Sequence, residues 1–166
     1  MFELKALPRD AVPRALEKAE RYRLLNEPAE AESICLDVLG VEPENQQALI
    51  TLLLAVTDEF DRRLGEAVHR AEEILPRLRG DYERAYYTGI VCERRAKARL
   101  HRGGPGAESA AHDWLHQAMQ WFDKAEPLAP AGNNDATLRW NTCARMLMQN
   151  PRLKPAPEER GEAPLE

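Results

Sequence analysis

Residues 27–49, EPAEAESICLDVLGVEPENQQAL, contain the pattern that decides the fold. After a proline that fits the first turn of a helix, Ala31, Cys35 and Val38 recur at the three- and four-residue spacing of one helical stripe. A glycine and a proline end that helix, and a second apolar stripe begins after Asn45. The stretch therefore predicts the second helix of one hairpin, a turn, and the first helix of the next hairpin.

The same arrangement recurs along most of the chain. Apolar residues at helical spacing alternate with breaks rich in Pro, Gly, Asn and Asp, such as the Gly-Gly-Pro-Gly stretch at 103–106. A stripe of small residues, Ala85, Gly89, Cys92 and Ala96, predicts that another helix approaches closely there. The expected helices cover about residues 13–25, 28–40, 46–57, 64–74, 81–102, 107–126 and 135–150, with a polar break at 58–63.

The composition excludes several classes of fold and function. Of the 166 residues, 24 are Ala and 21 are Leu, but only ten are Val or Ile, the aliphatic residues that sheets favour, so an all-α fold is expected. The net charge of −5 argues against a dedicated nucleic-acid binder. The longest nearly apolar stretch, residues 49–56, is too short to cross a membrane.

Cysteine usage and the N-terminal sequence bear on the cellular compartment. Cys35, Cys92 and Cys143 form no C-x-x-C pair and fall on apolar stripes, so we expect reduced core residues and no disulfide. The N-terminal residues show no secretory signal, and a cytoplasmic location is therefore expected.

The helical pairs also repeat in register. When Ala31, Ala67 and Ala118 are aligned, the positions four residues later are Cys35, Ala71 and Phe122, and those seven residues later are Val38, Ile74 and Ala125. This pattern resembles the tetratricopeptide repeat (TPR), a helix-turn-helix unit of about 34 residues with small residues where the paired helices touch. The sequence departs from that family at Leu53, Arg79 and Trp140, and its third repeat is lengthened. A related family of helical hairpins is the alternative.

The resemblance implies a right-handed α-solenoid, because a two-helix unit with one apolar stripe per helix must stack on its neighbours to bury that stripe. The expected organisation is a lead-in at 1–11, repeats at about 12–45, 46–80 and 81–132, a capping helix at 133–149, and a disordered Pro- and Glu-rich tail at 150–166.

Stacked hairpins of this kind leave a concave groove lined by the first helix of each pair. The resemblance implies that a peptide or helix of a partner protein binds there, as in an adaptor, assembly factor or chaperone, without catalysis or a cofactor. Apolar contacts would come from Ile50, Tyr86 and Ile90, and register from amide and carboxylate groups. The implied groove positions are Leu16, Glu20, Arg23, Gln47, Ile50, Leu54, Glu83, Tyr86, Ile90, Asn134, Thr137 and Asn141.

One known binding mode is not expected. Some tetratricopeptide proteins grip a terminal carboxylate with Lys and Asn on the first two groove helices. Here the equivalent positions are Leu16, Glu20, Ile50 and Leu54, so that clamp is missing.

Two further surfaces are candidates for interaction. Arginines on one side of the helix at 81–102 form a ridge that would receive an acidic segment or a phosphate group, although a solvated arginine face is the alternative. Its members are Arg84, Arg95, Arg99 and Arg102. Trp140 extends an apolar run on the last helix of the array, which predicts self-association through that end, as in a homodimer. A homo-oligomeric structural subunit is therefore an alternative function.

The only hint of metal chemistry is the pair His112 and His116, four residues apart on a helix. Two histidines at this spacing can share a metal, as they do in H-E-x-x-H enzymes. The glutamate of that motif and a third ligand are lacking here, so a metal-binding protein is the weakest alternative, and no enzyme motif is found.

Overall fold

The computed structural model describes residues 1–157, and its regular structure in that range is entirely helical. The expectation of an all-α chain is confirmed for these residues. The α-helices are α1 (Val12–Leu24), α2 (Pro28–Val41), α3 (Gln46–Asp58), α4 (Phe60–Ile74), α5 (Asp81–Arg102), α6 (Ala107–Ala125) and α7 (Asp135–Gln149). Short 3-10 helices follow or precede them at η1 (Arg9–Ala11), η2 (Leu75–Arg77) and η3 (Glu126–Leu128).

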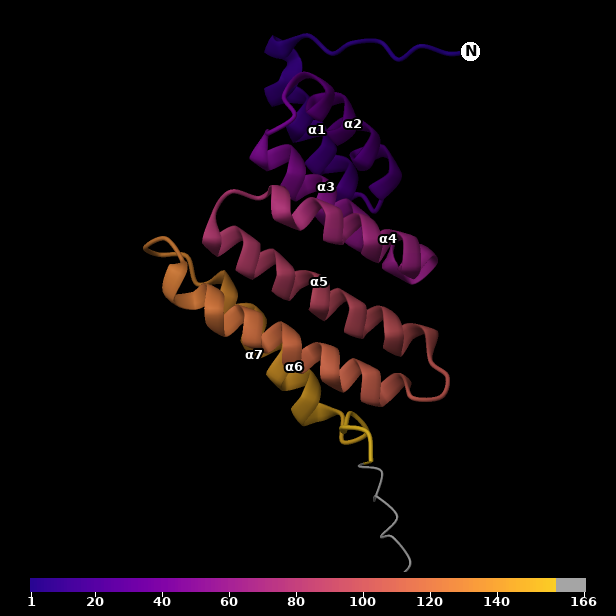
Figure 1. The fold of residues 1–166 in the computed structure, drawn as a ribbon, viewed down its shortest axis with the longest axis vertical. Helices are drawn as coiled ribbons and strands as arrows, with labels where there is room; N and C mark the ends of the chain where they lie inside the picture. Colours follow the sequence, from indigo (N-terminus) through magenta and orange to yellow (C-terminus); the bar gives the residue numbers. More distant parts are fainter. Residues whose placement is uncertain (158–166) are drawn as a thin grey trace, which may run out of the picture.

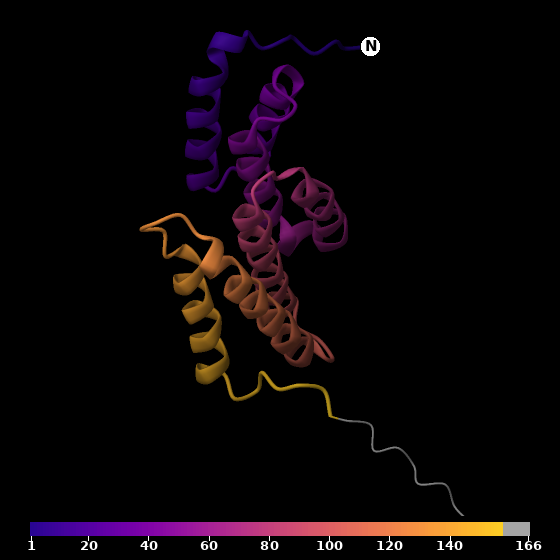
Figure 2. The same ribbon diagram turned by 60° about the vertical axis from the view of Figure 1, so that its left-hand side comes forward.

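Each α-helix packs against the next one along the chain, from α1 on α2 through to α6 on α7. As a result the helices follow one another down the long axis of the molecule, with the N-terminal segment at one end (Figure 1). Seen from a second side, α7 lies beside the long hairpin of α5 and α6 at the opposite end (Figure 2). We call α1 with α2, α3 with α4, and α5 with α6 the three pairs, and α7 follows them.

The first core lies between α1, α2, α3 and α4 and reaches α5 through Val91 and Ala98. On α2, α3 and α4 its buried residues include members of the predicted apolar stripes, and Leu49, Leu53 and Val56 are fully buried. On α1 the core also takes in Val12 and Leu16. Asn45 positions the start of α3 because its side-chain Oδ1 accepts a hydrogen bond of 2.9 Å from the backbone N–H of Ala48.

The second core joins α5, α6 and α7 around Leu115 and Phe122, both fully buried. The predicted close approach on α5 occurs at Gly89, where a Cβ atom would lie 2.6 Å from the ring of Phe122. Any side chain at this position would collide with that ring, which explains why the stripe consists of small residues.

The break expected at 58–63 is shorter in the structure. Helix α3 continues to Asp58 and α4 already begins at Phe60, although Arg63 has non-helical angles, φ −136° and ψ 45°, and kinks the helix. Phe60 is only 2% exposed. Burial of this ring in the first core accounts for the ordered turn in a segment that is otherwise polar.

After α7, the chain packs back on the helices through Leu153, which is buried in the second core. Residues 158–166 of the predicted disordered tail lie outside the described residues. Among the helices of residues 1–157, none combines the length and the apolar character needed to cross a bilayer.

The three cysteines are buried and free. Desolvation raises the pKa of the Cys35 and Cys143 thiols to about 12 and that of Cys92 to about 11. Thiols held in this protonated form are poor nucleophiles and metal ligands, in agreement with a structural role in the core.

Candidate functional site

The first contact network joins three alternate helices through one carboxylate. Asp58 at the end of α3 accepts a hydrogen bond of 2.8 Å from Nε of Arg23 on α1 and another of 2.8 Å from Nη1 of Arg94 on α5. All three side chains are between 17% and 26% exposed, so water competes little for these bonds. The first helices of the three pairs are therefore connected directly to one another.

A second network continues from α5 to α7. Glu93 has no exposed side-chain surface, and its Oε1 accepts from Nζ of Lys97 and, at 3.3 Å, from Nη1 of Arg139. Its Oε2 is buried and has no hydrogen-bond partner within the described residues. Removing an ionised carboxylate from water costs several kcal/mol, which the two cations offset. We call the surface of α1, α3, α5 and α7 that carries both networks the first-helix face.

Aromatic side chains occupy the N-terminal half of α5 on this face. The ring of Tyr86 stacks on Tyr82, with centroids 5.5 Å apart, and meets the edge of Tyr87 at 5.0 Å. The Tyr82 hydroxyl donates to Oδ1 of Asn133 at 3.3 Å, and the same oxygen accepts the backbone N–H of Asp135 at the start of α7. The tyrosines thus help to fix where α7 begins.

Burial and the charged neighbours act in opposite directions on these hydroxyl groups. Burial raises the pKa of Tyr86, whereas the nearby guanidinium of Arg139 lowers it. Burial also raises the pKa of Tyr87, to about 12. Both tyrosines are therefore neutral at physiological pH and can donate or accept hydrogen bonds.

The structure places most of the predicted groove residues at the surface of α3, α5 and α7. Gln47 and Asn134 are exposed, and Ile50 and Tyr86 are partly exposed. The other partly exposed members are Leu54, Glu83, Thr137 and Asn141.

Two predicted groove positions are wrong. Ile90 is 1% exposed and belongs to the second core, and Leu16 is 4% exposed and belongs to the first. Helical phase places both side chains toward the first-helix face, but neighbouring helices cover them, so neither is available to a partner.

The predicted arginine ridge is largely engaged within the protein. Arg84 donates to the carbonyl oxygens of Leu78 and Arg79 and to the carboxylate of Asp81. Arg102 is exposed.

Two arginines of the ridge, Arg95 and Arg99, hold α5 to adjacent segments. The guanidinium of Arg95 lies 3.7 Å from the ring centroid of Trp114 and pairs with Glu72. Arg99 donates to the carbonyl oxygens of Gly103 and Pro105 in the turn that follows α5. These contacts give both arginines structural roles.

The histidine pair lies on α6, with ring centroids 4.4 Å apart. His112 Nδ1 is 3.0 Å from Oδ1 of Asp113, and His116 is exposed. Within residues 1–157, no group of three or more His, Cys, Asp or Glu side chains is positioned to hold a metal ion.

Trp140 on α7 packs against the second core and is partly exposed. Its Nε1 is buried and has no hydrogen-bond partner within the described part of the chain. The predicted self-association through this residue stays a prediction.

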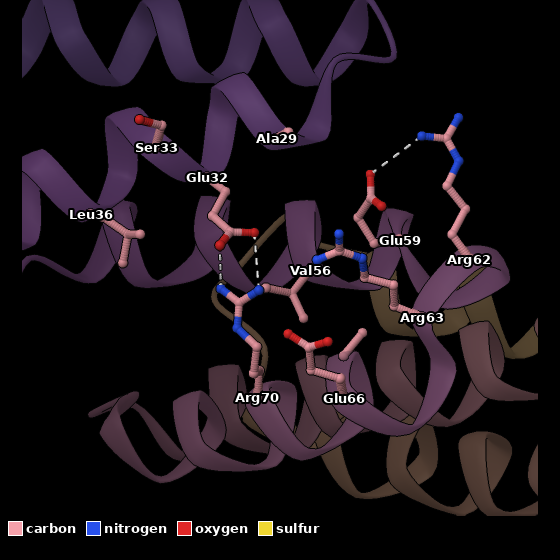
Figure 3. Close-up of a pocket in the computed structure, with 11 residues that line it drawn as sticks. Ala29, Glu32, Ser33, Leu36, Val56, Glu59, Arg62, Arg63, Glu66 and Arg70 are labelled. Carbon is pink, nitrogen blue, oxygen red and sulfur yellow. Dashed lines mark hydrogen bonds and ion pairs between the residues drawn. The ribbon is translucent and has the colours of Figure 1, made fainter.

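On the side of α2 and α4, a pocket of about 460 Å³ opens at the kink of α4. Glu32 and Arg70 line this pocket and form a bidentate ion pair, in which the two guanidinium nitrogens of Arg70 lie 3.1 and 2.5 Å from the two carboxylate oxygens of Glu32 (Figure 3). Arg62 and Glu59 pair loosely at 3.9 Å near the rim. Arg63 and Glu66 also line the pocket, so three arginines meet three glutamates and the charges balance.

Sequence reasoning placed Arg23 in the groove but missed the two networks. The signal for the first network is its spacing, because Asp58 follows Arg23 by 35 residues and Arg94 follows Asp58 by 36. These intervals match one repeat of about 34 residues. No comparable signal identifies Arg139, which lies 46 residues after Glu93 because the third pair is longer.

No protein-family model, curated protein or solved structure matches the chain.

Proposed function

We propose that this chain is a tetratricopeptide-like solenoid whose first-helix face binds a peptide or helix of another protein, without catalysis. Support for the repeat comes from burial at equivalent positions. Ala31, Ala67 and Ala118 are 0%, 4% and 0% exposed, and the residues four and seven positions later are all at most 5% exposed. Equal burial at equal register is expected when each pair packs on the next in the same way.

The observation that carries the binding proposal is the pair of contact networks on alternate helices. Arg23 to Asp58 to Arg94, and Glu93 to Arg139, link α1 to α3, α3 to α5, and α5 to α7, which supports a shared binding surface on these helices. A partner segment lying on this surface would contact all four helices at once. The exposed amide of Gln47 and the partly exposed ring of Tyr86 would supply a hydrogen bond and apolar area.

The face supplies hydrogen-bonding, charged and aromatic groups, and the three cysteines are buried with raised thiol pKa values. These features favour binding over nucleophilic catalysis. A role as adaptor, assembly factor or chaperone in the cytoplasm follows from this proposal.

Site-specific photo-crosslinking tests the proposed surface. A photoreactive residue in place of exposed Gln47 on α3 is compared with the same residue at exposed Gln117 on α6, in native lysate. We expect a discrete adduct with one partner protein from position 47 and none from position 117. Equal labelling from both positions would show that the first-helix face is not the binding surface.

A further inference from the structure

We infer that the partner segment is acidic and that its carboxylates bind beside Arg94 and Lys97. This inference rests on the proposed function and adds the chemistry of the ligand. It differs from a clamp on a terminal carboxylate, whose Lys and Asn positions are occupied here by Leu16, Glu20, Ile50 and Leu54.

The charge count of the two networks is the first observation. They contain four cations, Arg23, Arg94, Lys97 and Arg139, but two carboxylates, Asp58 and Glu93. Asp61 lines the adjoining pocket, so the four cations exceed the three carboxylates of this region by one charge. An acidic segment would neutralise this excess.

The second observation is which charges face the solvent. The carboxylate of Glu93 has no exposed surface, whereas the side chains of Lys97 and Arg139 are 40% and 35% exposed. The network therefore hides its negative charge and presents its positive charge. Each guanidinium carries five N–H donors, and Arg94 uses one of these on Asp58.

A pocket marks where a carboxylate would lie. It has a volume of about 190 Å³ and is lined by charged residues of α3, α4 and α5 together with Thr57, Phe60 and Ala98. The charged residues are Asp58, Asp61, Arg94 and Lys97. Asp58 is already bound to two arginines, so Asp61, which is exposed, is the remaining negative charge at this pocket.

The opposite half of the face has another character. Tyr82 and Tyr86 lie there with the carboxylates of Glu83 and Asp135, both of which act on the tyrosine pKa values. Because acidic residues of a partner would be repelled at this end, the face is polarised. We expect the acidic part of the segment near Lys97 and its apolar part near Tyr86.

A fluorescein-labelled hexaglutamate peptide tests the charge preference by fluorescence anisotropy, with labelled hexaglutamine as the neutral control. We expect saturable binding of hexaglutamate in about 50 mM NaCl that weakens strongly at about 300 mM, because exposed ion pairs are screened by salt. The overall charge of −5 opposes non-specific attraction of this probe. No binding of hexaglutamate, or equal binding of hexaglutamine, would overturn the inference.

Three substitutions locate the site. Lys97→Gln should weaken hexaglutamate binding about fivefold and keep the fold, since the amide can still donate to Glu93. Asp61→Asn should strengthen binding, because it removes the free negative charge of the pocket. Arg62→Gln removes the same charge as Lys97→Gln at an exposed site on α4, outside the two networks and the arginine ridge, and should leave binding unchanged.

The same experiment separates this inference from the proposed function. An equal loss in Lys97→Gln and Arg62→Gln would show general electrostatic attraction and overturn the acidic-ligand site. A crosslinked partner from position 47 together with no hexaglutamate binding would keep the proposed surface and reject only the ligand chemistry. A thermal melt of each variant by circular dichroism shows whether it is folded, and Lys97→Arg should restore binding.

Discussion

Two charged regions of this molecule differ in how their charges are buried. In the pocket between α2 and α4, three arginines face three glutamates, and the Arg62 side chain is 75% exposed. In the networks of the first-helix face together with the adjoining Asp61, four cations face three carboxylates, and Glu93 is fully buried. The first region is neutral and includes the partly buried ion pair of Glu32 and Arg70, whereas the second carries an excess of one positive charge. The capacity to attract a ligand follows from the balance and burial of the charges and not from their number.

The largest difference between the two regions is expected in the free energy of unfolding after their cations are removed. The double variant Lys97→Met with Arg139→Met leaves the buried Glu93 carboxylate without a cation, and the free energy of unfolding should fall by about 3 kcal/mol. Urea denaturation at pH 7 measures this change.

The matched control is Arg62→Met with Arg63→Met in the exposed pocket. Its free energy of unfolding should change by less than about 0.5 kcal/mol, as is usual for surface substitutions. Equal losses in the two double variants would remove the distinction drawn between the regions.

A smaller loss of stability is expected at alkaline pH from one buried thiol near each region. These thiols are Cys35, close to Glu32, and Cys143, close to Glu93. Both have a pKa of about 12 in the folded protein, above the value of 9.0 for a free thiol. A raised folded pKa means that stability is complete below pH 9 and is lost as the pH rises toward 12. When the pH is raised from 8 to 10, each thiol should lower the free energy of unfolding by about 1.4 kcal/mol.

Urea denaturation under reducing conditions at the two pH values checks this expectation. Cys35→Ala and Cys143→Ala should each reduce the alkaline loss by the contribution of one thiol. If either variant lost as much stability as the wild type, the corresponding thiol would be ionising in the folded state.

The smallest effects belong to single ion pairs of the α2–α4 pocket. Arg70→Ala breaks the bidentate pair with Glu32 and should lower the free energy of unfolding by about 1 kcal/mol. Arg62→Ala breaks only the loose pair with Glu59, and its effect should stay below about 0.5 kcal/mol. Thermal melts of both variants would contradict this ranking if Arg62→Ala were the more destabilised.

The helices could be predicted from the sequence because helical periodicity is a local property. Ala31, Cys35 and Val38 fall on one stripe in the sequence and on one buried face in the structure. The close approach at Gly89 was predictable for the same reason, since a row of small side chains leaves room for a neighbour.

The depth of a side chain and the long-range ion pairs could not be predicted in the same way. Tyr86 and Ile90 are four residues apart on one side of α5, but only the tyrosine reaches the surface. Helical phase gives a direction, whereas burial depends on residues from other helices, such as Leu54 and Trp140, that pack in the same core. The intervals of 35 and 36 residues between Asp58 and its partners indicate equivalent repeat positions, but they do not give the side-chain contacts.

The sharing of Asp58 between two arginines has a mechanical consequence. Arg23 and Arg94 come from helices on either side of α3, and both bonds end on the same carboxylate. Any bending that separates α1 from α5 must lengthen one of these bonds. The charge of this one residue therefore adds to the resistance to bending that packing of the first core already provides.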